Sequence, residues 1–180
     1  MTSLKVSRKI QVINDMRIFD NINSLLNFFD SNDYTSKIPI YVTSGGFDPI
    51  HVGHMRCILE TTSMADRDGG YVVVIVNGDG FLQRKKGGAF MPEKERAEII
   101  AGIRGVDAVL IWDDGGQTVI GAIEKIKPDY FTKGGDRAAP EDIPEWQVCQ
   151  DTGCKVIFNV GGEKIQSSSW LLRNLESADR

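Results

Sequence analysis

Apolar residues in this chain fall into short continuous runs that alternate with stretches of helical spacing. Residues 71–76 form one such run, which is almost wholly β-branched, as is typical of a parallel strand buried on both faces. Similar runs predict further strands at 38–44, 108–112, 130–132 and 154–160. Apolar residues at helical spacing predict helices at 52–64, 119–126 and 168–175, and a proline followed by acidic residues predicts another helix at 92–100.

This alternation predicts an α/β fold in which five parallel strands form one sheet. We take residues 38–180 as the domain that contains it. Residues 1–37 read differently, because Ile22, Leu25 and Phe29 recur at helical spacing without any group that carries chemistry. We therefore expect this N-terminal extension to cover an edge of the sheet or to form the contact of a homodimer.

The composition narrows the class of protein. Hydrophobic residues make up 41% and charged residues 26% of the 180 residues, which is typical of a globular domain. The net charge of −4 argues against a general nucleic-acid-binding surface. No apolar run reaches the roughly 18 residues that a membrane-spanning helix needs. Cys57, Cys149 and Cys154 lack the spacing of a zinc site or a disulfide framework, so we expect a reducing, cytoplasmic location.

The only two histidines of the chain, His51 and His54, lie three residues apart behind a glycine-rich turn. The turn follows the first strand of the predicted domain and leads into a predicted helix, so both imidazoles should share one face of its first turn. A helix N-terminus offers unpaired N–H groups and the positive end of the helix dipole, which together bind anions. The pattern therefore indicates a phosphate site, although either histidine taken singly would be an ordinary surface or core residue.

Three further polar segments follow predicted strands or open a predicted helix. Residues 83–88 are a basic, glycine-containing loop, residues 133–137 place two glycines between charged residues, and residues 166–170 contain three successive serines. In isolation these would be a solvated surface, a plain turn and a helix cap. Because the carboxyl ends of parallel strands meet at one edge of a sheet, we expect all three to converge with the histidines on one crevice.

These groups suit a nucleoside triphosphate. Attack at its α-phosphorus would release pyrophosphate, and a phosphate monoester acting as nucleophile is already ionised at neutral pH and needs no strong general base. Catalysis would then depend on positioning and on stabilising charge. We expect Mg²⁺ to neutralise the polyphosphate, but the sequence does not show which residues would ligate it.

From about residue 38 to residue 175 the motifs resemble, in order, those of the cytidylyltransferase-like nucleotidyltransferases, which carry an HxGH signature. The matching segments are GGFDPIHVGH at 45–54, Asn77 and Asp79, Lys86-Gly87, Glu95-Arg96, KPD at 127–129, KGGD at 133–136 and the serines at 167–169. The branch that they resemble contains heptose-1-phosphate adenylyltransferases and glycerol-3-phosphate cytidylyltransferases. The resemblance implies a Rossmann-like three-layer sandwich with a parallel five-stranded sheet.

The resemblance also implies roles for individual residues. His51, His54 and Lys86 would be catalytic, with the histidines stabilising the α- and β-phosphates in the transition state. The nucleotide would be bound by Gly46, Phe47, Asp48, His51, Gly53, His54, Lys133, Gly134, Gly135, Asp136, Ser167, Ser168 and Ser169. The second substrate would be bound by Asp79, Arg84, Lys85 and Arg96.

The implied reaction is transfer of AMP or CMP from a nucleoside triphosphate to a phosphorylated sugar or polyol, and the KGGD segment favours ATP. Pro49 is more typical of the nicotinate-mononucleotide and phosphopantetheine adenylyltransferases, so an acceptor of that kind is an alternative. A second alternative is a non-catalytic nucleotide-binding regulatory module on the same fold. A third, a fragment of an aminoacyl-tRNA synthetase, is disfavoured because no basic surface for tRNA and no second synthetase motif is present.

Overall fold

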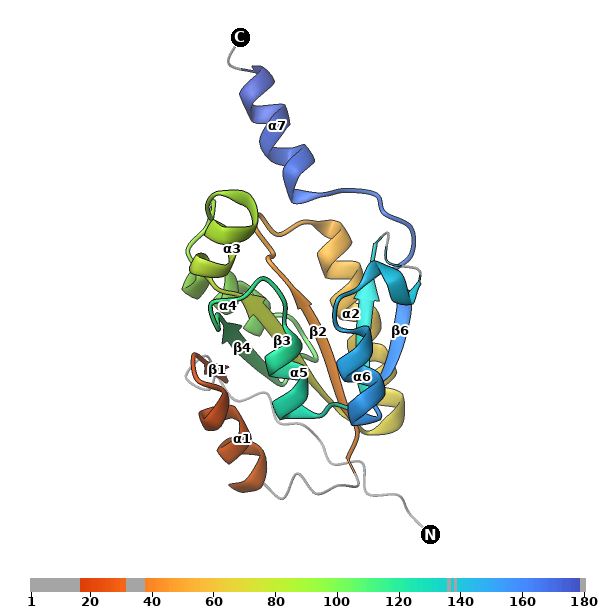
Figure 1. The fold of residues 1–180 in the computed structure, drawn as a ribbon. Helices are drawn as coiled ribbons and strands as arrows, with labels where there is room; N and C mark the ends of the chain where they lie inside the picture. Colours follow the sequence, from red (N-terminus) through yellow and green to blue (C-terminus); the bar gives the residue numbers. More distant parts are fainter. Residues whose placement is uncertain (1–16, 32–37, 136, 138, 179–180) are drawn as a thin grey trace.

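Strands and helices alternate along most of the chain, as the hydrophobic pattern predicts (Figure 1). The computed structural model describes residues 17–31, 38–135, 137 and 139–178, with side chains as far as Arg173. In chain order the elements are β1 (Ile18–Phe19), α1 (Ile22–Ser31), β2 (Ile40–Gly45), α2 (Val52–Asp68), β3 (Tyr71–Asn77), α3 (Asp79–Lys86), α4 (Glu93–Ala101), β4 (Ala108–Trp112), α5 (Ile120–Ile126), β5 (Tyr130–Gly134), the 3₁₀ helix η1 (Pro140–Asp142), α6 (Trp146–Thr152), β6 (Lys155–Val160) and α7 (Ser168–Ala178).

The strands form one parallel sheet in the order β1-β4-β3-β2-β5-β6. From β2 the chain first builds outward through β3 and β4, and then returns to add β5 and β6 on the other side of β2. The order therefore reverses between β2 and β5, which is the switch point where doubly wound sheets bind ligands. The predicted parallel α/β class is confirmed.

The expected number of five strands is wrong, because the N-terminal segment adds a sixth. Ile18 and Phe19 pair in parallel with Val109 and Leu110 of β4, so this segment covers an edge of the sheet. A strand of two residues is too short to show a period-2 pattern, which is why the sequence did not reveal it. The predicted helix that follows is α1, whose apolar side chains are buried against the sheet and α5.

Helices cover both faces of the sheet, so the body of the protein has three layers (Figure 1). Successive side chains of β3 pack alternately into the cores on the two faces of the sheet. Val73 and Ile75 belong to the core beneath α1, α5 and α6, whereas Val72, Val74 and Val76 belong to the core beneath α2 and α4. This sharing explains why β3 reads as a continuous β-branched run, since neither of its faces meets water.

Helices α3 and α6 were not predicted. Residues 83–86, expected in a basic loop, form the last turns of α3, which ends at Gly87 with φ 87°. Phe81 and Leu82 are the only buried side chains of α3, and adjacent residues give no helical period. The last helix, α7, was predicted, and it extends away from the three layers (Figure 1).

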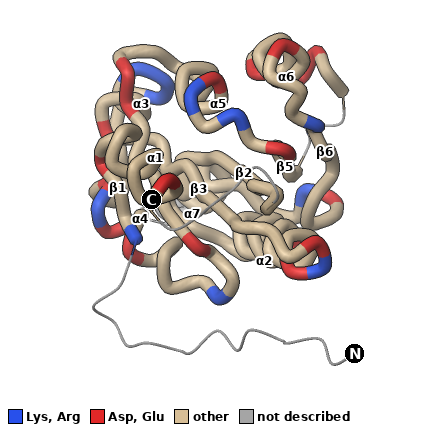
Figure 2. The backbone as a smooth tube through the Cα atoms, turned by 90° about the horizontal axis from the view of Figure 1, so that it is seen from below, with Lys and Arg blue, Asp and Glu red and all other residues tan. Residues whose placement is uncertain are grey.

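Apart from the basic run of Arg84, Lys85 and Lys86 at the end of α3, charged residues do not gather by sign on the described part of the chain. Lys and Arg positions are interspersed with Asp and Glu positions around the body (Figure 2). Among the described residues, no helix combines the length and the apolar character needed to cross a membrane.

Candidate active site

A pocket of about 630 Å³ lies over the carboxyl ends of β2 and β5. Its walls come from the β2–α2 turn, the ends of β3 and β5, the last turn of α3 and the segment that joins β6 to α7. The volume lies in the range of roughly 300–1,000 Å³ that is usual for small-molecule sites. The crevice expected at the switch point is therefore present, and distant parts of the sequence converge on it.

Two glycines allow the walls of this pocket to approach closely. A Cβ atom on Gly53 would lie 3.0 Å from the ring of His51, and one on Gly134 would lie 2.8 Å from the carbonyl oxygen of Val160 and 2.9 Å from Sγ of Cys57. Side chains at these positions would displace the histidine or separate β5 from β6 and α2. Packing therefore requires glycine at residue 134, and at residue 53 it leaves the His51 ring in its position.

The two histidines lie together at the N-terminus of α2. His51 is the N-cap residue, and its Nδ1 accepts a hydrogen bond of 3.1 Å from the backbone N–H of Gly53. The ring of His54 stacks on that of His51 with centroids 3.7 Å apart, and Phe47 meets it edge-on at 5.0 Å. The expected placement on one face of the first helical turn is thus what the structure shows.

Both imidazoles are held neutral at physiological pH. Burial, assisted by the charge that His51 would carry, lowers the pKa of His54 to about 3, and burial also lowers the pKa of His51. Because Nδ1 of His51 accepts a hydrogen bond, the proton of its neutral ring belongs on Nε2. In the described structure Nδ1 of His54 is buried and has no hydrogen-bond partner. Neutral rings of this kind act as hydrogen-bond donors to anions rather than as ion-pair partners.

The three serines bring a second helix N-terminus to the same place. Ser167 caps α7, because its hydroxyl accepts a hydrogen bond of 3.2 Å from the N–H of Trp170. Ser168 donates a hydrogen bond of 2.9 Å to the carbonyl oxygen of Pro49, which joins the start of α7 to the β2–α2 turn. Neither α2 nor α7 has an acidic residue in its first turn. The positive ends of both helix dipoles thus face one end of the pocket, and neither helix has a carboxylate in its first turn to offset them.

Lys86 reaches the pocket from α3 and is anchored there by Asp48. Its Nζ donates hydrogen bonds to the side chain of Asp48 at 2.7 Å and to the backbone carbonyl of the same residue at 3.0 Å. Asp48 also accepts from the N–H groups of Phe90 and Met91 at 2.8 and 2.7 Å. Burial alone would raise the pKa of Asp48, but these hydrogen bonds outweigh it and the pKa is lowered. Asp48 therefore fixes both Lys86 and the chain after α3, and Lys85 lines the pocket beside them.

Three of the residues expected at the second substrate do not reach the pocket. Arg96 is 1% exposed and donates hydrogen bonds of 2.6–2.9 Å to the carbonyl oxygens of Gly46, Asn77 and Met91 and to the carboxylate of Asp79. Arg84 instead pairs with Asp113 and bonds to the carbonyl oxygen of Gly116. These arginines hold the turns around the pocket in place. Asp136 lies outside the described residues.

The structure adds residues that the sequence did not single out. Ser44 lines the pocket, and so does Glu145, which is the N-cap of α6 and is 4% exposed. Nζ of Lys133 lies 3.2 Å from the hydroxyl of Ser44 and 3.5 Å from Oε2 of Glu145. Ser44 could have been found from its position at the end of a predicted strand. Glu145 carried no such signal, because α6 itself was not predicted.

Among the described residues, no group of three or more His, Cys, Asp or Glu side chains is arranged to hold a metal ion. Mg²⁺ commonly binds phosphates and retains several waters, so it does not need such a group. The donor set is therefore compatible with an ion that arrives on a polyphosphate.

Comparison with known proteins assigns the family. Residues 42–166, more than half of the chain, match the cytidylyltransferase-like family. The chain belongs to this family. The expectation of a nucleotidyltransferase enzyme is thereby confirmed, and the matched residues include the turn that carries His51 and His54.

The relatives are consistent with this assignment. Bifunctional protein HldE of Gluconobacter oxydans is 32% identical over 148 residues, which cover 77% of this chain and 28% of the relative. Bifunctional protein HldE of Koribacter versatilis is 37% identical over 114 residues, which cover 59% of this chain and 22% of the relative. The chain thus spans about a quarter of the length of these proteins.

A solved structure supports the fold. The lipopolysaccharide core biosynthesis protein from Thermoplasma volcanium GSS1 superposes with a TM-score of 0.56 at 21% identity, covering 68% of this chain and 96% of that chain. At this level of identity the likeness concerns the arrangement of the sheet and its helices.

Proposed function

We propose that this nucleotidyltransferase transfers the AMP or CMP part of a nucleoside triphosphate to a phosphorylated sugar or polyol and releases pyrophosphate. The observation that carries the proposal is the meeting of two helix N-termini, with His51 and His54 on one and Ser167 to Ser169 on the other, at one end of the switch-point pocket. Such an end suits a chain of phosphates.

The nucleotide lies across the crevice with its phosphates at this end. The serines hold the β- and γ-phosphates by their hydroxyls and by the free N–H groups of α7. The backbone of Gly134 and Gly135 runs beside the ribose and base. This placement follows from the direction of the positive helix ends and from the absence of side chains at the two glycines.

An oxygen of the acceptor phosphate attacks the α-phosphorus, a new P–O bond forms, and the bond to the bridging oxygen of the β-phosphate breaks so that pyrophosphate leaves. His51 and His54 stabilise the charge that develops on the non-bridging oxygens by donating hydrogen bonds from Nε2. Because both rings are neutral, their contribution is directional hydrogen bonding in a partly buried site rather than net charge. Lys86, fixed by Asp48, supplies positive charge at the wall of the pocket.

Mg²⁺ is expected to accompany the nucleotide and to neutralise part of its charge. The residues that the structure describes would leave most of its ligands to phosphate oxygens and water. The acceptor is named at the level of a phosphorylated sugar or polyol because relatives in the family include HldE proteins and because the structural neighbour is a lipopolysaccharide core biosynthesis protein.

The test is a matrix of nucleotides and acceptors that is assayed by pyrophosphate release. ATP and CTP are each combined with heptose 1-phosphate, glycerol 3-phosphate, nicotinate mononucleotide and phosphopantetheine. Turnover that requires a sugar or polyol phosphate supports the proposal. Turnover only with nicotinate mononucleotide or phosphopantetheine refutes the proposed acceptor class, and nucleotide binding without turnover anywhere in the matrix indicates a regulatory binding module.

A further inference from the structure

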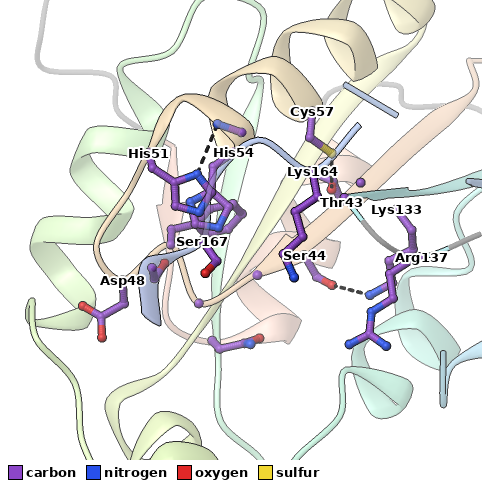
Figure 3. Close-up of a pocket in the computed structure, with 18 of the residues that line it drawn as sticks. Thr43, Ser44, Asp48, His51, His54, Cys57, Lys133, Arg137, Lys164 and Ser167 are labelled. Carbon is purple, nitrogen blue, oxygen red and sulfur yellow. Dashed lines mark hydrogen bonds between the residues drawn. The ribbon is translucent and has the colours of Figure 1, made fainter. Parts of the chain in front are cut away.

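Lys133 lies at the opposite end of the pocket from the histidines. Along a strand successive side chains point to opposite faces of the sheet. Thr132 faces α2, where its hydroxyl lies 2.8 Å from that of Thr61, so Lys133 faces the side of α5 and α6. Its Nζ lies 4.4 Å from the centre of the Phe131 ring, which belongs to the core on that side. Figure 3 shows Ser44 and Lys133 together at one end of the pocket and His51, His54 and Ser167 at the other.

The ammonium group of Lys133 is held in a fixed position. It donates a hydrogen bond of 3.2 Å to Ser44 and lies 3.5 Å from Oε2 of Glu145. The side chains of Lys133 and Glu145 are 15% and 5% exposed, and Oε1 of Glu145 accepts a hydrogen bond of 3.3 Å from the N–H of Val119. An ammonium group has three N–H donors, so one remains for a ligand in the pocket. Burial lowers the pKa of Lys133, and Glu145 opposes this effect.

The surroundings of this donor indicate what it would bind. Lys133 and Glu145 together carry no net charge, so this pair by itself does not select a phosphate group. Arg137 also lines this end of the pocket (Figure 3), and its guanidinium donates a hydrogen bond of 2.6 Å to the carbonyl oxygen of Asp142. Three pocket residues close to Glu145 are aliphatic and offer no aromatic face on which a base could stack: Ile143 and Pro144, which precede it in the chain, and Val119, whose N–H donates to it. The hydroxyl of Ser44 accepts from Lys133 and can still donate its own proton. Two converging donors of this kind match a sugar or polyol hydroxyl.

We propose that Lys133 binds a hydroxyl group of the phosphorylated acceptor, with Glu145 as the residue that positions it. The inference rests on the proposed function and deepens it. It also reassigns the side chain of Lys133, which the family resemblance places beside the base and ribose of the nucleotide. The transferring phosphate would then lie at the histidine end of the pocket, with the acceptor extending across the switch point from the histidines towards α6.

The experiment compares acceptors with and without hydroxyl groups. Pyrophosphate release is measured with heptose 1-phosphate against its monodeoxy analogues, and with glycerol 3-phosphate against n-propyl phosphate. Lys133→Met is expected to lower kcat/KM for the hydroxylated acceptor about tenfold to hundredfold, the loss typical of a hydrogen bond to a charged group. The KM for the nucleotide stays unchanged, and the variant no longer distinguishes the acceptor from the analogue that lacks the bound hydroxyl.

Glu145→Gln keeps an oxygen for the N–H of Val119 and removes only the charge beside Lys133. It is expected to raise the KM for the hydroxylated acceptor severalfold, with the KM for the nucleotide unchanged. Lys125→Met and Glu124→Gln, both exposed on α5, are matched controls and should leave all constants unchanged. If Lys133→Met does not fold, the double variant Lys133→Met/Glu145→Gln removes both buried charges together and gives the same comparison.

Three outcomes would overturn the inference. If Lys133→Met raises the KM for the nucleotide and leaves the KM for the acceptor unchanged, Lys133 belongs to the nucleotide site. Full discrimination between hydroxylated and deoxygenated acceptors in Lys133→Met would show that the hydroxyl is bound elsewhere. Absence of turnover with every sugar or polyol phosphate in the unaltered chain would refute the proposed function and this inference with it, which separates that failure from the other two.

Discussion

Replacement of Arg96 by methionine tests whether this residue holds the site together or binds substrate. The guanidinium is 1% exposed and its four hydrogen bonds join the ends of β2 and β3 to the chain before α4. Methionine fills a similar volume but donates no hydrogen bond. The carbonyl oxygens of Gly46, Asn77 and Met91 lose their arginine donor, whereas Asp79, whose side chain is 45% exposed, can turn to water.

The expected loss follows from the number of acceptors left unpaired. At about 1–1.5 kcal/mol for each of the three carbonyl oxygens, the free energy of unfolding should fall by roughly 3–5 kcal/mol. This is a large part of the roughly 5–15 kcal/mol that stabilises a typical domain. Arg96→Lys keeps the charge but not the planar fork, so we expect about half of that loss.

Urea unfolding followed by circular dichroism measures the change, and Arg104→Met, at an exposed arginine after α4, is the control. The control should stay within about 0.5 kcal/mol of the unaltered chain. Kinetics measured on the folded fraction of Arg96→Lys should show a reduced kcat, because Gly46 is displaced. The KM values for the two substrates should change to the same extent. A loss below about 1 kcal/mol in Arg96→Met, together with a raised KM for the acceptor alone, would refute this reasoning and return Arg96 to the second substrate.

Further changes probe the phosphate end of the pocket. His54→Ala should keep the fold and lower kcat for pyrophosphate release about 10²–10³-fold, as expected for the loss of a donor to the transition state; a loss below tenfold would contradict the role. The pKa of His54 is about 3 and lies below its unfolded value, so its contribution to stability is complete above about pH 6.5 and is lost as the pH falls towards 3. Between pH 7 and pH 4 this loss is at most about 3 kcal/mol, measured as the difference in unfolding between the unaltered chain and His54→Phe, while NMR titration checks the pKa directly. Asp48→Asn releases Lys86 and one backbone N–H and should cost about 2 kcal/mol, with a raised KM for the nucleotide as the second readout.

The sequence by itself determined the elements that carry strong periodicity and the segment that carries the chemistry. The run at 71–76 is β-branched because both faces of β3 are covered, and that requirement is visible residue by residue. His51 and His54 were recognisable for a similar reason. Their spacing places them on one face of a helix turn whatever surrounds it, and the structure puts them there with rings stacked at 3.7 Å.

Only the tertiary structure decided the parts that depend on pairing between distant residues. β1 exists because β4 offers it an edge, and its two residues carry no pattern of their own. Arg96 reads as a surface charge until the ends of β2 and β3 surround it with carbonyl oxygens. Glu145 becomes part of the pocket because α6 places it beside Lys133, which lies twelve residues earlier on another element. Local periodicity records which face of an element is buried, but hydrogen-bond partners across the fold leave no trace in the spacing of the residues that they join.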